Sequence, residues 1–204
     1  YMRLPETLAL AKEAALKSVV LLKNDNQTLP LAKHGQKIAL IGPLADSNQV
    51  VGAWGSLARN EECISLLFGM ESLVGAENIV HAKGCDILGN NRDGFAQAIA
   101  VAKSADIIIL AVGEDQSMSG EAKSRAYLNI PGVQNELAQA LKALDKPLVT
   151  IVFSGRPIEL GWYAENSDAI LQAWFLGNES GNALASILFG DSNPSGKLAM
   201  SFPY

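Results

Sequence analysis

Carboxylates and basic residues gather in one polar loop directly after the most apolar segment of the chain, Ile107–Val112. This loop holds Glu114 and, in the stretch Ser-Gly-Glu-Ala-Lys-Ser-Arg, Glu121, Lys123 and Arg125. Loops that follow strands are where open α/β folds place their sites, and a carboxyl group there can transfer protons. Glu121 is the preferred acid, and no second catalytic carboxylate stands out. We therefore expect half of an active site, with the other half on protein outside this chain.

Two readings of this loop remain open from the local residues. Glu114, one residue past the predicted strand, is the rival of Glu121 as acid or substrate contact. Its place beside the sheet also suits hydrogen bonds to a neighbouring loop. Lys123 and Arg125 would lower the pKa of Glu121 if they pointed at it, so we expect them to point elsewhere or to support the loop. The alternative is a solvated loop whose charges only pair with one another.

A second loop, 42–59, contains Trp54 between small residues. An exposed indole on a Gly-rich loop is a flat platform for the apolar face of a sugar ring or for another protein. The alternative is a Trp that folds back onto the sheet edge. Further along the chain, Arg156 in Ser-Gly-Arg-Pro is expected to brace a neighbouring loop.

Composition excludes several classes of function. The chain has 204 residues, 49% of them hydrophobic, and a net charge of −5 without a basic cluster, so nucleic acid is not an expected partner. The longest run without a charged residue, 47–58, contains Gly, Asn and Gln, and predicts no membrane span. Cys63 and Cys85 are expected to be free thiols. No ligand cluster predicts a metal, and no organic cofactor is implied.

Strand and helix patterns alternate along the chain. Continuous apolar strands separated by helices predict a three-layer α/β sandwich with five or six mainly parallel strands. The loops 42–59, 113–131, 154–160 and 176–181 should then meet at one edge of the sheet. A first amphipathic helix is expected from Pro5 to about Leu22. Strands are expected at 37–41, 79–82, 107–112, 148–153 and 169–175, and helices at 65–74, 92–104, 133–144 and 182–189.

Several segments in order carry a resemblance to a known family. They are Val20–Asn24 with Leu29–Leu31, Ile41–Asp46, Gly52–Trp54, Val112–Glu114 with Gly120–Arg125, Trp174–Gly177, Leu188–Leu198 and Ser201–Pro203. Together they resemble the C-terminal α/β sandwich domain of glycoside hydrolase family 3, of the bacterial β-glucosidase type. The resemblance covers nearly the whole chain. It departs from the usual pattern at Ala199, where proline is common.

The resemblance implies a retaining, exo-acting β-glycosidase that acts on terminal β-linked sugars of oligosaccharides or β-glucosides. An N-terminal barrel, absent from this chain, would supply the nucleophilic aspartate. Glu121 matches the general acid/base and Trp54 a loop aromatic beside the leaving-group subsite. Residues 1–35 would be a linker helix and extended lead-in, and 36–204 the sandwich domain. The resemblance also implies a periplasmic or secreted location, although no signal-peptide pattern opens the sequence.

The isolated chain is expected to be inactive, because the nucleophile lies elsewhere. The main alternative is a non-catalytic carbohydrate-binding or interdomain module that uses Trp54 for stacking. A nucleotide-binding domain is a weaker alternative, because the segment 41–46 lacks the Gly-x-Gly-x-x-Gly spacing and Pro43 removes an N–H.

Overall fold

The computed structural model describes residues 3–55 and 58–203, and within them six strands form one sheet. The strands are β1 (Val20–Asn24), β2 (Ile38–Ile41), β3 (Ile79–Ala82), β4 (Ile107–Gly113), β5 (Leu148–Phe153) and β6 (Ala169–Gln172). The helices are α1 (Pro5–Ser18), α2 (Leu66–Val74), α3 (Phe95–Lys103), α4 (Gln134–Lys142), α5 (Gly161–Asn166) and α6 (Ser180–Leu188). The strand order is β1-β6-β5-β4-β2-β3, and only β1 runs antiparallel to its neighbour.

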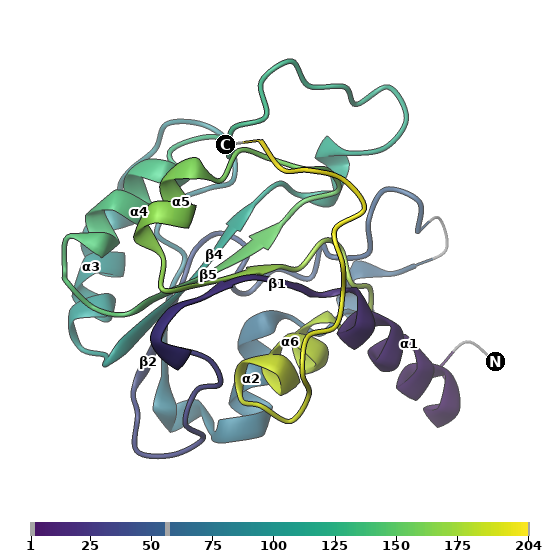
Figure 1. The fold of residues 1–204 in the computed structure, drawn as a ribbon, viewed down its shortest axis with the longest axis horizontal. Coiled ribbons are helices and arrows are strands. Elements are labelled where there is room, and N and C mark those ends of the chain that lie inside the picture. The colour runs from purple at the N-terminus through teal and green to yellow at the C-terminus, as the bar shows by residue number, and fades with distance from the viewer. Residues whose placement is uncertain (1–2, 56–57, 204) are drawn as a thin grey trace.

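The sheet is covered on both faces, which explains its continuous apolar strands. Every residue of β2, β4, β5 and β6 is buried. Alternate side chains enter opposite cores: Ile109 and Ile151 belong to one, Ile108 and Leu110 to the other. Helices α2 and α6 lie on the first face, and α3, α4 and α5 on the second (Figure 1). The predicted three-layer sandwich is confirmed.

The N-terminal helix is shorter than predicted. It ends at Ser18, because Val19 takes an extended conformation. Residues from Val20 onward then form edge strand β1, whose Cα partners in β6 include Leu171 for Leu21. The predicted continuation of the helix to Leu22 is therefore wrong. Its physical cause is pairing with a strand about 150 residues later in the sequence, which a local helical pattern does not register.

Strand β6 and helix α5 also differ clearly from the sequence prediction, and several other boundaries shift by one to three residues. Strand β6 ends at Gln172 rather than at Phe175, and Trp174 has a positive φ of 56°, which is incompatible with a strand. The short helix α5 was not predicted at all. Among the described residues, no helix combines the length and apolar character that a bilayer crossing needs, and both cysteines are free and buried.

The topology creates a switch point between β2 and β4. From β2 the chain moves outward to β3, whereas from β4 it moves the other way to β5 and β6. The loops that leave β2 and β4 at their carboxyl ends therefore diverge and open a crevice, which is where ligands bind in sheets of this kind. These are the loops that carry Trp54 and Glu121.

Candidate active site at the carboxyl edge of the sheet

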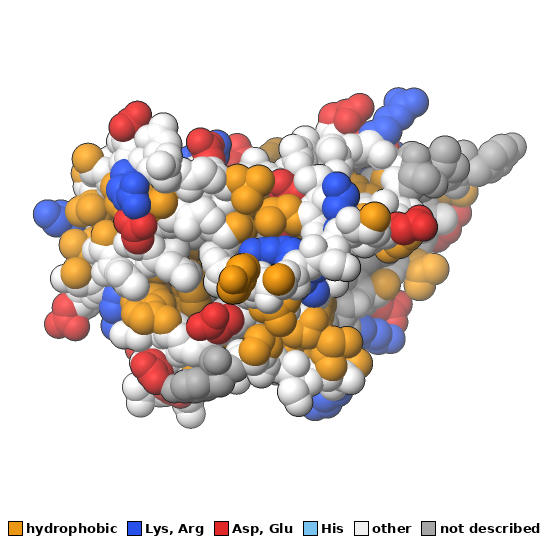
Figure 2. Space-filling model, turned by 90° about the horizontal axis from the view of Figure 1, so that it is seen from above, with side chains coloured by type: hydrophobic (Ala, Val, Ile, Leu, Met, Phe, Trp, Pro, Cys, Tyr) orange, Lys and Arg blue, Asp and Glu red, His pale blue; other side chains and the backbone are white. Residues whose placement is uncertain are grey.

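The four loops predicted to converge do meet at this edge. Gly52 N–H donates to Gln116 Oε1 over 3.2 Å, which joins the loops after β2 and β4. Gly177 N–H donates to the Val50 carbonyl over 2.8 Å, which adds the loop after β6. Arg156, after β5, reaches the loop after β4. Figure 2 shows the molecule from above, with Lys and Arg side chains beside hydrophobic ones near the centre of the view.

Trp54 and Glu121 line one open cleft of about 470 Å³. The indole of Trp54 is 75% exposed, so the prediction that it stands out from the sheet edge is confirmed. Gly120 lets the two loops approach closely, since a Cβ at this position would lie 2.7 Å from Ala53 Cβ. The cleft thus brings an exposed flat aromatic surface and an exposed carboxyl group to the same place.

Glu121 occupies the tip of a tight turn. Gly120 and Ala122, on either side of it, have positive φ values of 113° and 59°. Lys123 N–H donates to the Gly120 carbonyl over 3.3 Å and closes the turn. The side chain of Lys123 is exposed and also lines the cleft, and no ion pair joins it to Glu121 in the part of the chain that the structure describes. The turn therefore presents the Glu121 carboxyl group outward to solvent.

Glu114 lies beneath this turn rather than in the cleft. Its side chain is fully buried, and both of its oxygens are bound by guanidinium groups. Arg125 Nη1 donates to Oε1 in a very short contact, and Arg156 Nε donates to Oε2 over 3.2 Å. Arg125 also donates to the Asn129 carbonyl over 3.1 Å, so it points into the loop and not at Glu121.

The two ends of the loop after β4 are tied together by Gln134. Its side chain is fully buried, accepts from Gly113 N–H over 2.9 Å and donates to the Pro131 carbonyl over 3.1 Å. Sequence reasoning missed this residue, because a glutamine at the start of a helix is ordinarily exposed. The predicted bracing role of Arg156 is confirmed, since its guanidinium binds two carbonyls of the loop.

A second polar cavity of about 500 Å³ lies beside the cleft, over β2 and β3. Asp46, His81, Lys83, Asp86 and Asp115 contribute to its wall. Burial lowers the pKa of His81 below its usual value, so its imidazole stays neutral to lower pH than an exposed one. No group of three or more metal-ligating side chains occurs in residues 3–55 and 58–203.

Neither cysteine has the environment of a nucleophile. Burial raises the pKa of Cys85 to about 11, and burial together with nearby carboxylates also raises that of Cys63. A thiol of this kind stays protonated at neutral pH and is unreactive. The two cysteines are therefore not candidates for nucleophilic catalysis at this edge.

The fold and its loop edge define an α/β sandwich domain that carries a carboxyl group over an open cleft. Residues 19–204 match the model of the glycosyl hydrolase family 3 C-terminal domain. The chain belongs to this family and corresponds to that domain.

Relatives of known name agree with this assignment. A periplasmic β-glucosidase of Salmonella typhimurium is 43% identical over 95% of this chain, and a β-xylosidase of Formosa agariphila is 40% identical over 95%. The crystal structure of a β-glucosidase from Listeria innocua superposes with a TM-score of 0.93 at 38% identity and covers 98% of this chain. The chain spans only 28% of the length of the first two proteins and 27% of the third.

Proposed function

We propose that this chain is the acid/base-carrying domain of a retaining, exo-acting β-glycosidase of the β-glucosidase type. The observation that carries the proposal is the position of Glu121, exposed at the tip of a turn and sharing a cleft with Trp54. An N-terminal barrel of the same polypeptide is proposed to supply the nucleophilic aspartate. The chain covers only 28% of the length of the Salmonella relative, which is consistent with a further domain in the polypeptide.

The chemistry requires the two carboxyl groups to act in turn. The aspartate attacks the anomeric carbon while Glu121 donates its proton to the glycosidic oxygen, and the leaving group departs as an alcohol. Glu121 then takes a proton from water, which attacks the glycosyl-enzyme and regenerates the aspartate. In this account the isolated chain is inactive, because it lacks the group that forms the covalent bond.

The other predicted site residues take supporting roles in this proposal. Trp54 offers its indole face to the sugar on the leaving-group side, as aromatic side chains suit the C–H face of a ring. The sequence also allows Glu114 as a substrate contact, but its burial and its two guanidinium partners favour support of the loop. Arg125 supports the loop through the same contact. Lys123 contributes its backbone to the turn and its side chain to the cleft wall.

The arrangement of the rest of the polypeptide is also a proposal. We propose that α1 belongs to the connection from the barrel, as part of the lead-in predicted for residues 1–35. Strand β1 lies within that range and is already part of the sheet. The name of the Salmonella relative supports a periplasmic or secreted location.

The exposure of Trp54 also favours a second candidate function, a non-catalytic carbohydrate-binding or interdomain module. An indole that is 75% exposed would stack on a sugar without any help from Glu121. In that case the domain would bind sugar by itself, and Glu121 would be dispensable in the full-length protein.

Azide rescue of a Glu121→Ala variant of the full-length enzyme separates the two candidates. With an activated aryl β-glucoside, the aspartate can still form the glycosyl-enzyme, which then accumulates because no base activates water. Azide needs no deprotonation, so it should restore turnover and release a β-glycosyl azide with retained configuration. If Glu121→Ala hydrolyses the substrate as fast as wild type, and azide changes nothing, the binding-module function is favoured instead.

A further inference from the structure

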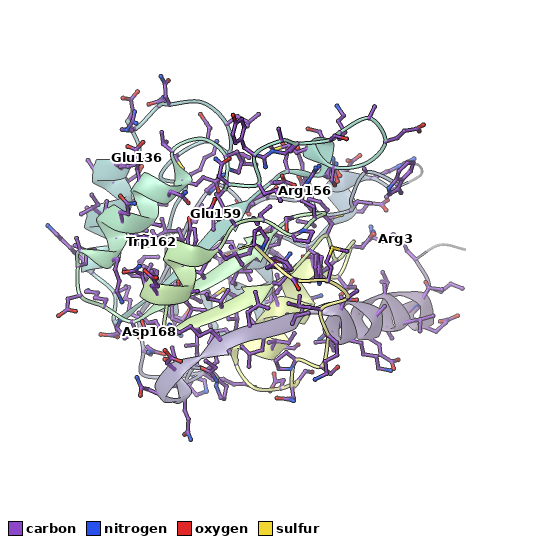
Figure 3. All side chains as sticks on the ribbon, turned by 45° about the horizontal axis from the view of Figure 1, so that its top comes forward. Arg3, Glu136, Arg156, Glu159, Trp162 and Asp168 are labelled. Atoms are coloured by element: carbon purple, nitrogen blue, oxygen red, sulfur yellow. The ribbon has the colours of Figure 1, made fainter. Side chains whose placement is uncertain are left out.

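One nitrogen of Arg156 binds the chain on both sides of Glu121. Arg156 Nη2 donates to the Met118 carbonyl in a very short contact and to the Lys123 carbonyl over 2.8 Å. The segment between these two carbonyls is the turn that carries Glu121 at its tip. A single guanidinium thus closes the base of the turn, and Figure 3 labels Arg156 beneath this region.

Arg156 is itself held rigidly at the sheet edge. Its Nε donates to the buried carboxylate of Glu114 over 3.2 Å. Its backbone carbonyl accepts from Ser154 Oγ over 2.7 Å, and Ser154 Oγ accepts from Gln172 Nε2, at the end of β6, over 2.9 Å. Arg156 is therefore held at the ends of β4, β5 and β6, through its backbone carbonyl on one side and its guanidinium group on the other.

The neighbouring residue Gly155 lets the turn sit directly on this support. A Cβ at Gly155 would lie 2.2 Å from Ser119 Oγ and 2.7 Å from Ser119 Cβ, so only glycine admits the loop at this distance. The short Gly-Arg pair after β5 therefore does two things for the loop after β4: the glycine makes room for its backbone, and the arginine binds it.

We propose that Arg156 is a positioning residue for the reaction, which clips the base of the turn so that the Glu121 carboxyl group is held at one place over the cleft. The inference rests on the proposed function of Glu121. Arg156 acts through the backbone of the turn and touches neither substrate nor the reacting atoms. Displacement of a catalytic group by about 1 Å can lower a rate by about 100-fold, so a clip of this kind matters for kcat.

Arg156→Lys and Arg156→Met in the full-length enzyme separate positioning from stability. Lysine keeps the charge beside Glu114 but cannot bind Glu114 and both carbonyls at once, since its ammonium is a point charge rather than a planar fork. Arg156→Lys should therefore unfold near the wild-type midpoint, yet lose about 10- to 100-fold in kcat on cellobiose with KM little changed. In kcat/KM, which reports formation of the glycosyl-enzyme, an activated aryl β-glucoside should lose only a few-fold, because its leaving group needs little protonation. Its kcat should fall further, because the same carboxyl group activates water in the second step. Arg156→Met should lose both stability and kcat.

Hydrogen exchange of the amides of residues 118–124 gives a readout independent of activity, and should speed up in both variants. The matched control is Arg92→Met, which removes an exposed Arg92–Glu136 pair and should leave exchange and kinetics unchanged. Wild-type exchange and kcat in Arg156→Lys, or equal losses of kcat/KM on both substrates, would overturn the positioning role. If Glu121→Gln itself shows no dependence on the leaving group, the proposed function fails, whatever Arg156 does to loop exchange.

Discussion

In the full-length enzyme, Glu121→Gln is expected to lower kcat/KM for cellobiose by about 10²–10⁴-fold, the usual contribution of general acid–base catalysis. Gln keeps the size of the side chain but has no proton of suitable acidity to give to the glycosidic oxygen. An aryl β-glucoside with an activated leaving group should lose far less in its glycosylation step, since that leaving group departs as a stable anion. Steady-state kinetics on the two substrates measure the difference.

The matched control for this prediction is Glu77→Gln. Glu77 is an exposed carboxylate in the short turn Ala76–Asn78 that leads into β3, at the opposite edge of the sheet from the cleft. Its loss should leave both substrates at wild-type rates. If Glu121→Gln behaves like this control, Glu121 is a loop residue without a catalytic role. Equal losses of kcat/KM on both substrates would also contradict the acid role, because in the glycosylation step a missing proton donor affects mainly the poor leaving group.

The second large effect is expected on stability. Glu114→Ala leaves the guanidinium groups of Arg125 and Arg156, 19% and 18% exposed, without their shared carboxylate. Breaking a buried ion pair by removing one partner typically destabilises by about 3–5 kcal/mol, since the remaining charge is desolvated and uncompensated. At roughly 2–4 °C per kcal/mol for a domain of this size, the thermal midpoint should fall clearly.

Thermal unfolding of the full-length protein measures this effect, with Glu13→Ala as the control. Glu13 pairs with Lys17 on the exposed surface of α1, at 2.6 Å, and both side chains are more than half exposed. Surface pairs of this kind contribute little, so the control should unfold like wild type. A Glu114→Ala variant that unfolds as late as the control would show that the buried cluster does not stabilise the domain.

The fold was largely predictable because its central strands carry their own signal. Segments such as Ile107–Val112 and Leu148–Phe153 are apolar on both faces, which only a doubly covered sheet explains. The edge strand β1 has no such continuous apolar pattern that would predict a strand. Its residues continue the apolar spacing of α1, and only the partner strand β6, far along the chain, selects the extended form.

The site, like the fold, was predictable from the sequence only in part. Sequence position after a strand, together with the family resemblance, pointed to Glu121 and Trp54, and the structure brings both to one cleft. The cluster of Glu114, Arg125 and Arg156 could not be assembled from sequence, because it depends on which side chains of β4 and β5 loops face one another. Gln134 could not be identified from the sequence either, because a single buried amide side chain leaves no periodic pattern.

The most direct test of the account is the distance between two carboxyl groups in a crystal structure of the full-length enzyme with a bound substrate analogue. If Glu121 is the acid/base of a retaining pair, its carboxyl group should lie about 5–5.5 Å from that of the barrel aspartate, across the anomeric carbon. A separation of about 6.5–9.5 Å would indicate an inverting enzyme. A Glu121 that points away from the bound sugar would contradict the central claim outright.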